Sequence, residues 1–590
     1  MIALGTVAAV LAAMATNRVP PDLALIGGML VLVVTGVVGL KEAVSGFGNE
    51  GMLTVAVLFI VAAAMQRSGA MTLLTRPLLG APTTTRGALL RMSLPISGIS
   101  GFINNTPLVA MSLPVVVDWA KRIGLSPSRL LMPLSYATIL GGTLTMIGTS
   151  TNVVVNGQLL EFGRVEGAGL PFFTPFLVGV PVLVAGILVL VLLAPRLLRD
   201  RVPCQGAFAD PRRFTTEATV DAGGALDGAE VAVLRARGVN PVEIVRGSDL
   251  IPAPAPDTVL HAGDRLVLAG PATAIIALGA VPGLTLSAEH HYGVDDDAQR
   301  SGRRHLYEVV ISDRSPVVGE AVGTGAFRRR YQATIVALSR QGEAVSGARH
   351  ADWVLRPGDS ALVEAGAGFA SHPDRDRDFW MLDRHDAPDR RPGAAPWLAL
   401  AITAAMCLAA ATGWVSMLVA AIAAALAIIA TRLLSVGEAR SAIDMQVVIA
   451  IGASFALGAA LESSGAARWL AGSLLALGGD NPWVALALIY LVTAIVTELI
   501  TNNAAAVLIL PIALATADRL QVDYMPFAMA VMFAASASFM TPIGYATNLM
   551  VMGPGGYRLA DFLRLGGVLQ VVVGVVTVAL APVVWPFIRS

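Results

Sequence analysis

Hydrophobic residues dominate both ends of the chain, and polar residues dominate its middle. Residues 1 to about 200 and about 393 to 590 are apolar, whereas residues about 202 to 392 are rich in Arg and Asp. A helix needs a long apolar run to cross a hydrocarbon layer of about 30 Å. Runs of that length are 23–40, 172–193 and 395–430. The pattern therefore predicts two membrane halves separated by a polar insert.

The composition supports this division. The chain is 55% hydrophobic and only 14% charged, whereas soluble domains carry about 25% charged residues. The formal net charge of zero gives no indication of a nucleic-acid partner. Residues 1–16 lack the positive segment of a cleaved signal, so we expect a first short membrane helix that is retained. Cys204 and Cys407 suggest two inert thiols and no disulfide framework.

The two apolar halves repeat each other at an offset of 396 or 397 residues. Three motifs match in order, which is not expected by chance. Asn104-Asn105-Thr106 corresponds to Thr501-Asn502-Asn503, residues 148–152 correspond to 544–548, and residues 66–70 correspond to 462–466. Repeats with broken apolar segments at matching positions are typical of the binding sites of secondary transporters.

The polar insert is itself duplicated. Gly263-Asp264 and Gly358-Asp359 each form a turn that leads into a β-rich run, and residues 243–246 and 333–337 also read as short strands. We expect two small α+β domains. The predicted boundaries are 1–201 for the first membrane repeat, 202–292 and 293–385 for the two inserted domains, and 386–590 for the second membrane repeat.

Arginines flank the insert on both sides and predict its location. Arg196, Arg199 and Arg201 leave the first half, and Arg384, Arg390 and Arg391 precede the second. By the positive-inside rule the insert is cytoplasmic. An odd number of crossings in each half would make the repeats inverted. The predicted fold is an α-helical polytopic membrane protein with inverted repeats and re-entrant hairpins, carrying an inserted pair of small α+β cytosolic domains.

Four stretches of the membrane halves lack charge but are dense in Asn, Thr, Ser, Gly and Pro. They are residues 92–117, 130–160, 499–517 and 524–557. Irregular backbone in a membrane is tolerated only beside protein or a water-filled cavity. Helix N-termini there suit an anion, whereas carbonyl, Asn and Thr oxygens suit Na⁺. A divalent anion would need co-bound cations to offset its desolvation, which gives a physical reason for coupling.

The candidate site residues follow from these breaks. The candidate substrate ligands are Asn104, Asn105, Thr106, Thr151, Asn152, Thr501, Asn502, Asn503, Thr547 and Asn548. The candidate ligands of the coupling ion are Asn105, Gly148, Thr149, Asn502, Thr541, Pro542, Gly544 and Glu498. The alternative is that these polar side chains only satisfy helix–helix contacts, and the duplication favours a site.

Glu498 has several interpretations. It lies in an apolar run three residues before Thr501, and its counterpart in the first half is Gly101. Intramembrane carboxylates are costly and usually functional. Glu498 is therefore a candidate cation ligand or proton-coupling group, or else an interfacial carboxylate at a helix end. The sequence carries no nucleophile triad, metal-ligand cluster or nucleotide fingerprint, so we do not expect an enzyme.

These motifs resemble the divalent anion/sodium symporter family, within the citrate-transporter-like ion transporter superfamily. That family carries Ser-Asn-Thr once per repeat at hairpin tips, and the motifs at 104–106 and 501–503 occupy those places with amide and hydroxyl exchanges. Residues 541–551 and 553–557, together with Glu498, look like the sulfate-permease branch. The insert is similar to paired TrkA-C (RCK C-terminal) domains.

The resemblance implies a homodimer in the cell inner membrane, with a scaffold subdomain and a transport subdomain that moves as an elevator. It also implies a small regulatory ligand at the cytosolic domains. We expect a Na⁺-coupled importer of sulfate or a similar oxyanion. The alternatives are a Na⁺- or H⁺-coupled transporter of succinate or citrate, and a membrane-anchored sensor whose output is the insert.

Overall fold

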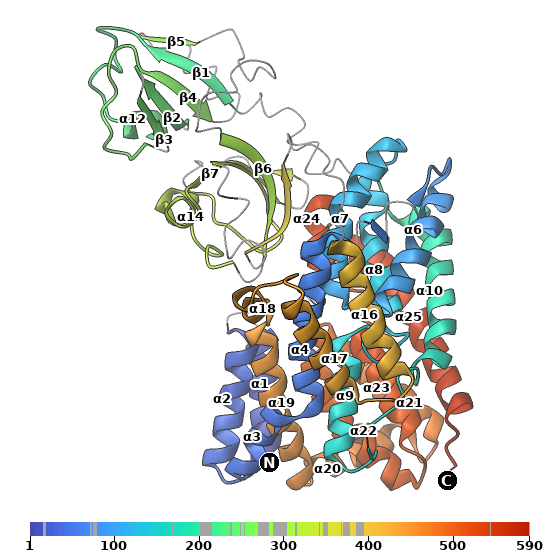
Figure 1. Cartoon of the computed structure of the whole chain (residues 1–590). Coiled ribbons are helices and arrows are strands. Elements are labelled where there is room, and N and C mark those ends of the chain that lie inside the picture. Colours follow the sequence, from blue (N-terminus) through green and yellow to red (C-terminus); the bar gives the residue numbers. More distant parts are fainter. Residues whose placement is uncertain are drawn as a thin grey trace.

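The structure is a computed structural model. It describes residues 1–15, 19–70, 73–74, 79–167, 169–200, 215–236, 239–247, 249–252, 254–269, 283–286, 304–312, 315–340, 343–345, 352–366, 369, 378–384, 395–542 and 544–588. Helices form an elongated body, and two sheets stand at one end of it (Figure 1). Both chain termini lie at the opposite end of the body.

The described residues of the first apolar half are mostly helical. The helices are α1 (Ile2–Ala15), α2 (Pro21–Val34), α3 (Leu40–Ser45), η1 (Gly46–Gly48), α4 (Glu50–Ser68), α6 (Thr85–Ser100), α7 (Asn105–Arg122), η2 (Pro127–Arg129), α8 (Leu131–Gly142), α9 (Ser150–Glu161) and α10 (Phe176–Leu197). The first helix lies where the sequence predicted it.

The second apolar half gives the same succession of helices. They are α16 (Ala395–Ala411), α17 (Met417–Ala430), α18 (Val436–Ala442), α19 (Met445–Ser463), α20 (Ala466–Gly478), α21 (Pro482–Thr497), α22 (Asn502–Leu520), α23 (Met525–Ser536), α24 (Ala546–Gly555) and α25 (Leu559–Val584). Equivalent helices have equal lengths in several cases, such as 19 residues in α4 and α19 and 12 in α8 and α23.

The helical body is built for a lipid environment. Within the described residues, five helical segments are long and apolar enough to cross a membrane. They are Leu40–Ser68, Phe176–Leu197, Met445–Ser463, Asn502–Leu520 and Leu559–Val584. The long helices α10 and α25 pack against each other and still expose large apolar side chains, such as Leu177, Val184 and Val575. Apolar surface of this extent is unfavourable in water, and lipid would cover it.

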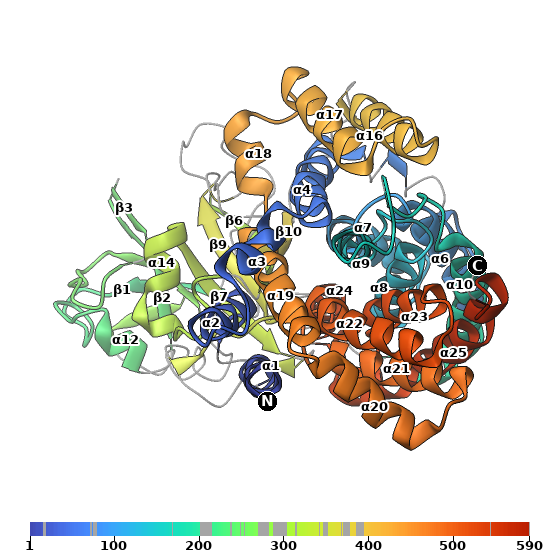
Figure 2. The same cartoon turned by 90° about the horizontal axis from the view of Figure 1, so that it is seen from below.

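The helices form two groups that meet along α9, α19 and α22. In one group α2 packs against α19, and α4 packs against α17. In the other, α6 packs against α8, α10 against α25, and α21, α22 and α23 against one another. Seen from below, α16 and α17 lie beside α4 at the edge of the molecule, away from α21 and α25 (Figure 2). The groups touch where α4 meets α9 and where α19 meets α22.

The insert contains two five-stranded antiparallel sheets. The first consists of β1 (Thr215–Val220), β2 (Asn240–Arg246), β3 (Asp249–Pro252), β4 (Arg265–Ala269) and β5 (Leu284–Leu286), in the order β3-β2-β4-β1-β5. The second consists of β6 (Arg304–Ile311), β7 (Ala333–Arg340), β8 (Glu343–Ala344), β9 (Ser360–Gly366) and β10 (Phe379–Arg384), in the order β10-β6-β9-β7-β8. Read from opposite edges, the two orders are equivalent. Short helices α12 (Ala232–Ala236), η4 (Val322–Thr324) and α14 (Ala326–Tyr331) connect the strands.

The two Gly-Asp turns of the insert are built alike. Gly263 and Gly358 have φ angles of +84° and +80°, which glycine adopts without the steric cost of a Cβ. The guanidinium of Arg246 pairs with the buried carboxylate of Asp264 at 2.8 Å, and that of Arg340 with Asp359 at 2.7 Å. Burial of Asp264 opposes ionisation, but the hydrogen bonds from Arg246 and the His261 amide outweigh it and lower the pKa of Asp264. Each turn is therefore held by an ion pair.

The predicted domain boundaries lie in parts of the chain outside the described residues. The same holds for Cys204, Arg201, Arg390 and Arg391. The division of the insert into two domains therefore stays a prediction. Cys407 is a buried free thiol on α16, packed against α4 and α17.

Candidate substrate and cation site

Two helical hairpins carry the paired Asn/Thr motifs. In the first, α6 ends at Ser100 and α7 begins at Asn105, so residues 101–104 form the tip. In the second, α21 ends at Thr497 and α22 begins at Asn502, so residues 498–501 form the tip. The first N–H groups of a helix have no partner within the helix, and they carry partial positive charge. Each motif therefore begins a helix whose N-terminus suits an anion.

Two further helices are interrupted near these tips. Helix α8 ends before residues 143–149, which precede α9, and α23 ends before residues 537–542 and 544–545, which precede α24. Each break contains a glycine at which an added Cβ would make a close contact, with backbone in the first break and with a side chain in the second. At Gly148 it would lie 2.5 Å from the carbonyl oxygen of Gly142, and at Gly544 it would lie 2.1 Å from Oγ of Ser538. The irregular backbone of both breaks is closely packed in the helical body.

Asn105 is the centre of the first tip and is fully buried. Its amide finds complementary partners when the nitrogen donates to the carbonyl oxygens of Thr138, at 3.1 Å, and Gly148, at 3.2 Å. The amide oxygen then accepts from the hydroxyl of Tyr545 at 2.6 Å. The nitrogen also lies 2.7 Å from Oγ of Ser100, which donates to Thr138 O at 2.8 Å. Asn105 thus joins the tip to the α8–α9 break and to the second half.

The second tip repeats part of this arrangement. Oγ1 of Thr497 donates to the carbonyl oxygen of Ala535 at 2.7 Å and lies 3.1 Å from Oδ1 of Asn502. Thr497, Ala535 and Asn502 are the repeat counterparts of Ser100, Thr138 and Asn105. Each lies 397 positions later in the chain. The hydroxyl that ties each hairpin to its interrupted helix is therefore duplicated. Asn502 is half-buried, in contrast to the fully buried Asn105.

An asparagine holds each interrupted helix. Nδ2 of Asn152 donates to the carbonyl oxygen of Thr145 at 2.8 Å. Nδ2 of Asn548 donates to the carbonyl oxygens of Ser538 at 2.9 Å and Thr541 at 3.0 Å. Both asparagines are buried. Their amides satisfy carbonyls that the breaks leave without helical partners, so these two predicted substrate ligands have structural bonds as well.

The two halves meet through polar side chains. Oγ of Ser135 lies 2.9 Å from Oγ1 of Thr547 and donates to Oδ1 of Asn548 at 2.7 Å. The hydroxyl of Tyr545 lies 3.3 Å from Oγ1 of Thr149. Ser135 and Tyr545 were not among the predicted site residues. Tyr545 could have been found, because it occupies the repeat position of Thr149.

The other predicted ligands lie around the same meeting point. Oδ1 of Asn503 accepts from Oγ of Ser150 at 3.1 Å and from Oγ1 of Thr151 at 3.4 Å, so the second tip contacts the start of α9. Asn104 and Thr106 are half-buried beside Asn105. Thr501 is exposed at the end of its tip, and Pro542 is buried in the α23–α24 break.

Glu498 is buried and hydrogen-bonded, with 9% of its surface exposed. Its carboxylate accepts from the backbone N–H of Met540 at 2.9 Å and from Oγ1 of Thr541 at 2.7 Å. Oγ1 of Thr541 also accepts from the Gly544 N–H at 3.1 Å. The carboxylate therefore joins the second tip to the α23–α24 break, an arrangement that does not fit a solvated helix end. The first tip has Gly101 in its place.

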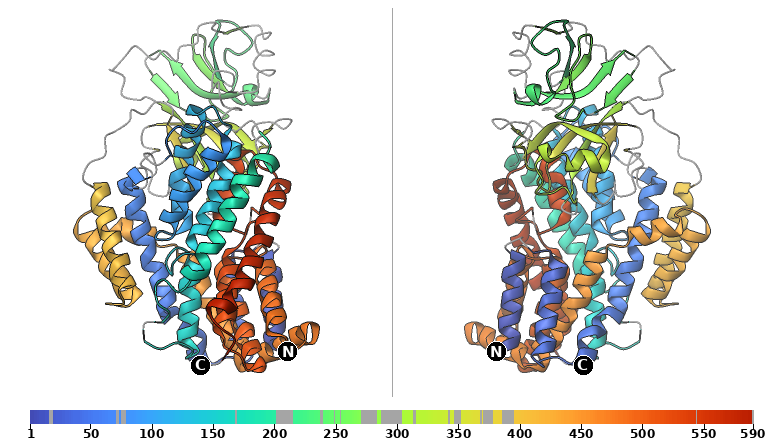
Figure 3. Two further views of the ribbon diagram at one scale, coloured as in Figure 1. Left: turned by 90° about the vertical axis from the view of Figure 1, so that its right-hand side faces the viewer. Right: turned by 90° about the vertical axis from the view of Figure 1, so that its left-hand side faces the viewer.

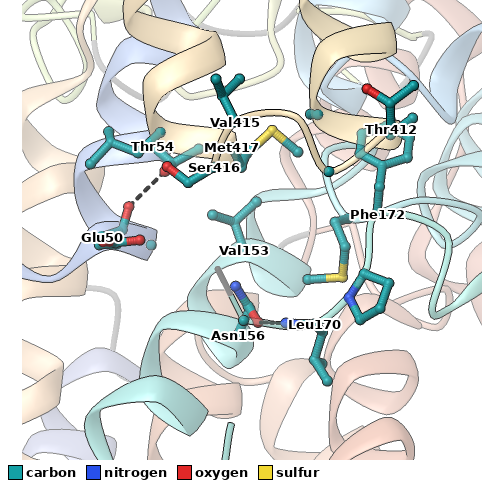
Figure 4. A pocket seen from close by; sticks show the side chains of 18 residues that line it. Glu50, Thr54, Val153, Asn156, Leu170, Phe172, Thr412, Val415, Ser416 and Met417 are labelled. Carbon is teal, nitrogen blue, oxygen red and sulfur yellow. Dashed lines mark hydrogen bonds between the residues drawn. The ribbon is translucent and has the colours of Figure 1, made fainter. Parts of the chain in front are cut away.

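A cavity of about 370 Å³ lies next to this region, between the two helix groups. Thr54 of α4, Ser416 before α17, and Val153 and Asn156 of α9 line it (Figure 4). Oδ1 of Asn156 accepts from the N–H of Leu170 at 2.7 Å. Among the described residues, those lining the cavity include none of the predicted ligands. The cavity does adjoin α9, which carries Thr151 and Asn152 at its start.

Apolar helices with exposed large hydrophobic side chains, together with paired hairpin tips, are features of a multi-pass membrane transporter of the secondary class. The family and the cotransporter relatives that follow are transporters and not enzymes. The chain belongs to the citrate transporter family, which it matches over residues 10–520 and again over residues 407–590.

The chain is similar along most of its length to relatives that include proteins named as transporters. The "Uncharacterized transporter sll0640" of Synechocystis is 32% identical over 580 residues, covering 96% of this chain and 94% of that protein. "Sodium/sulfate cotransporter 2" of Chlamydomonas reinhardtii is 25% identical over 741 residues, covering 91% and 84%. A second Chlamydomonas protein, provisionally named a sulfur deprivation response regulator, is 33% identical over 578 residues, covering 95% and 97%.

Proposed function

We propose that this protein is a Na⁺-coupled symporter of a divalent oxyanion, with sulfate as the substrate. The observation that carries the proposal is that two helix starts, one from each half, contact the same α8–α9 segment in a region without Lys or Arg. Asn105 of α7 reaches it through Gly148 O, and Asn503 of α22 reaches it through Ser150 Oγ. An anion bound by N–H groups, amides and hydroxyls alone keeps part of its desolvation cost, which co-bound cations offset. The relatives named as sodium/sulfate cotransporters agree with this chemistry.

Each half supplies ligands for one cation. In the first site, the carbonyl of Gly148, the side chain of Thr149 and the Asn105 amide provide oxygen, the donor type that hard cations prefer. The amide nitrogen of Asn105 lies 3.2 Å from Gly148 O, so the amide has to rotate to turn its oxygen toward a cation beside Gly148.

The second cation site consists of Asn502, Thr541, Pro542, Gly544 and Glu498. The hydrogen bond of 2.7 Å between Thr541 and the Glu498 carboxylate brings two of its oxygens together. The anion then binds between the tips, with the motifs at 104–106 and 501–503 and the helix starts Thr151-Asn152 and Thr547-Asn548 around it.

The proposed transport movement uses the two helix groups. The halves are inverted repeats. The group around α4, α17 and α19 is the fixed scaffold of a homodimer. The group of hairpins and interrupted helices holds the site and moves across the membrane relative to this scaffold, as in an elevator mechanism. The cavity between the groups lies where such sliding would occur. The insert consists of two TrkA-C-like domains on the cytoplasmic side of the cell inner membrane, where a small regulatory ligand would bind.

Uptake into proteoliposomes tests the proposal. Purified protein is reconstituted with K⁺ inside, and labelled sulfate is added outside with Na⁺ or with choline. We expect accumulation with an inward Na⁺ gradient and none with choline. Equal uptake driven by a pH gradient without Na⁺ would identify H⁺, and not Na⁺, as the coupling ion. Absence of sulfate uptake in all conditions would refute the substrate assignment.

A second candidate function is transport of a di- or tricarboxylate, because the family to which the chain belongs is named for citrate transport. Unlabelled citrate and succinate are added as competitors at a hundredfold excess over sulfate in the same assay. Inhibition by citrate together with uptake of labelled citrate would favour this candidate. A sensor role, suggested by the name of one relative, would be favoured by ligand binding without flux of any of these anions.

A further inference from the structure

The two insert sheets share a strand order but differ in their relation to the membrane helices. The second sheet lies next to the helical body, and the first lies farther out (Figures 1 and 3). Strand β6 packs against α24, and β10 packs against α7. Both helices begin with candidate ligands, Thr547-Asn548 on α24 and Asn105 on α7. The second sheet therefore touches the helices that carry the site.

Two glycines lie at the contact between the second sheet and α24. A Cβ at Gly553 of α24 would lie 2.3 Å from the carbonyl oxygen of Gly358, in the Gly-Asp turn of the second sheet. A Cβ at Gly358 would lie 3.3 Å from Cδ1 of Leu549, one helical turn earlier. Leu549 directly follows the candidate ligand Asn548. We name residues 356–359 the docking turn, because its backbone rests on the backbone of α24.

The second sheet has two faces, because side chains alternate along a strand. The face that meets the membrane helices, which we name the docking face, is opposite to the face that forms the core of the sheet. In β6, Val309 and Ile311 belong to the buried core of the second sheet. Val310 points to the opposite face. It is also fully buried, and it belongs to the hydrophobic cluster of the membrane helices. An apolar side chain on this outer face is therefore covered by the helical body.

The first sheet provides an internal comparison. Thr219 pairs with Arg265 as Val310 pairs with Ser360. Ala218 and Val220 fill the core of the first sheet, as Val309 and Ile311 fill that of the second. Thr219 is only half-buried, and Arg265 is exposed, whereas Val310 and Ser360 are fully buried. Gly263 is exposed where Gly358 is buried. The docking face is thus a feature of one copy.

We infer that the docking turn and Val310 form an interaction surface whose partner is α24, and that it couples the insert to the transport site. The contact fixes the second half of α24, and the start of the same short helix carries Thr547 and Asn548. A change in the insert that moves the second sheet would shift these ligands. The inference rests on the proposed function only for its transport consequence, because the contact itself is independent of the substrate.

Cysteine labelling tests the contact without any transported anion. In a full-length Cys204→Ser/Cys407→Ser background, Val310→Cys is exposed to a water-soluble maleimide, with Thr219→Cys as the matched control. We expect slow labelling at 310 and fast labelling at 219. Adding Gly553→Val or Ser360→Arg should raise the rate at 310 about tenfold by opening the contact and leave 219 unchanged. If the Gly553→Val protein does not fold, Ser360→Arg is the variant used to open the contact. Fast labelling at 310 in the background protein would overturn the inference.

Transport kinetics test the coupling. Gly358→Ala and Gly263→Ala introduce the same backbone strain, because both glycines have φ near +80°. We expect Gly358→Ala to change KM or the maximal rate severalfold and Gly263→Ala to leave both unchanged. The anion is whichever one the wild type transports, so failure of the sulfate assignment does not affect this comparison. Equal effects of the two variants would show that the turn has only a structural role.

Discussion

The two membrane halves share one scheme of hydrogen bonds and differ in three side chains at its centre. In each half a hydroxyl ties the hairpin to its interrupted helix, and an asparagine holds the break. At equivalent positions the first half has Gly101 and Thr149 where the second has Glu498 and Tyr545. Ser135 faces Asn548 from the first half, and its counterpart is Met532.

This comparison separates the residues that hold the backbone in both halves from the residues that differ between the halves. The shared bonds satisfy backbone groups that any interrupted helix leaves open, so both halves need them. The differing residues reach across to the other half or, as Glu498 does, add a carboxylate to one half only. We therefore expect variants of the shared residues to be more damaging than variants of the differing ones.

The largest effect is expected at the shared tip asparagines. Asn105→Ala and Asn502→Ala should each lower uptake by about 100-fold or more, because each removes a proposed ligand and a hydrogen bond, which is buried at Asn105 and partly buried at Asn502. Asn105→Ala should also reduce thermal stability, since Asn105 is fully buried. Initial rates at matched expression measure the loss. Asn481→Ala, which removes only a helix cap, is the control, and wild-type uptake by either tip variant would remove that residue from the site.

The glycines of the two breaks should respond unequally. Gly148→Ala places a methyl 2.5 Å from a backbone carbonyl that cannot move freely, and we expect about 1–3 kcal/mol of destabilisation. At Gly544 the close atom is Oγ of Ser538, a side chain that can rotate. Gly544→Ala should therefore cost less, and Ser538→Ala should restore part of the loss. Thermal unfolding in detergent measures both, and equal losses with no rescue would contradict the comparison.

Replacing the Glu498 carboxylate tests the difference between the two proposed cation sites. Glu498→Gln keeps the size of the side chain, and we expect the Na⁺ concentration for half-maximal uptake to rise about tenfold, or about 1.4 kcal/mol. Glu462→Gln is the matched control, because the first half has Gln66 at that position. An unchanged Na⁺ dependence in Glu498→Gln would exclude the carboxylate as a cation ligand.

The smallest effect is expected at Ser135. Ser135→Ala leaves Oδ1 of Asn548 without its donor, so the second half comes to match the first, where Oδ1 of Asn152 has no partner among the described residues. The cost should be about 1 kcal/mol of stability. Ser112→Ala is the control, since its buried Oγ also lacks a partner there. A loss no greater than in the control would mean that the Ser135 bond contributes nothing.

Sequence alone predicted the hairpin tips and breaks of the candidate site but not their contacts. Asn105 and Asn502 stood out because amides are rare in apolar segments and because both lie at one repeat offset. The offset shows which residues are equivalent, but it does not show which residues meet. The contacts of Tyr545 with Asn105 and of Ser135 with Asn548 depend on how the halves pack, so sequence could not reveal them. Likewise, the Gly-Asp turns revealed the duplication of the insert, whereas the docking of only one turn depends on Val310 facing outward.

A ligand-bound structure tests the central claim most directly. A cryo-electron microscopy map of the full-length protein in lipid, with Na⁺ and sulfate, is compared with a map in K⁺ without sulfate. The account predicts anion density between the starts of α7 and α22, with cation density beside Gly148 and beside Glu498. Sulfate density elsewhere, for example in the cavity between α4 and α9, with the two tips unchanged, would contradict it.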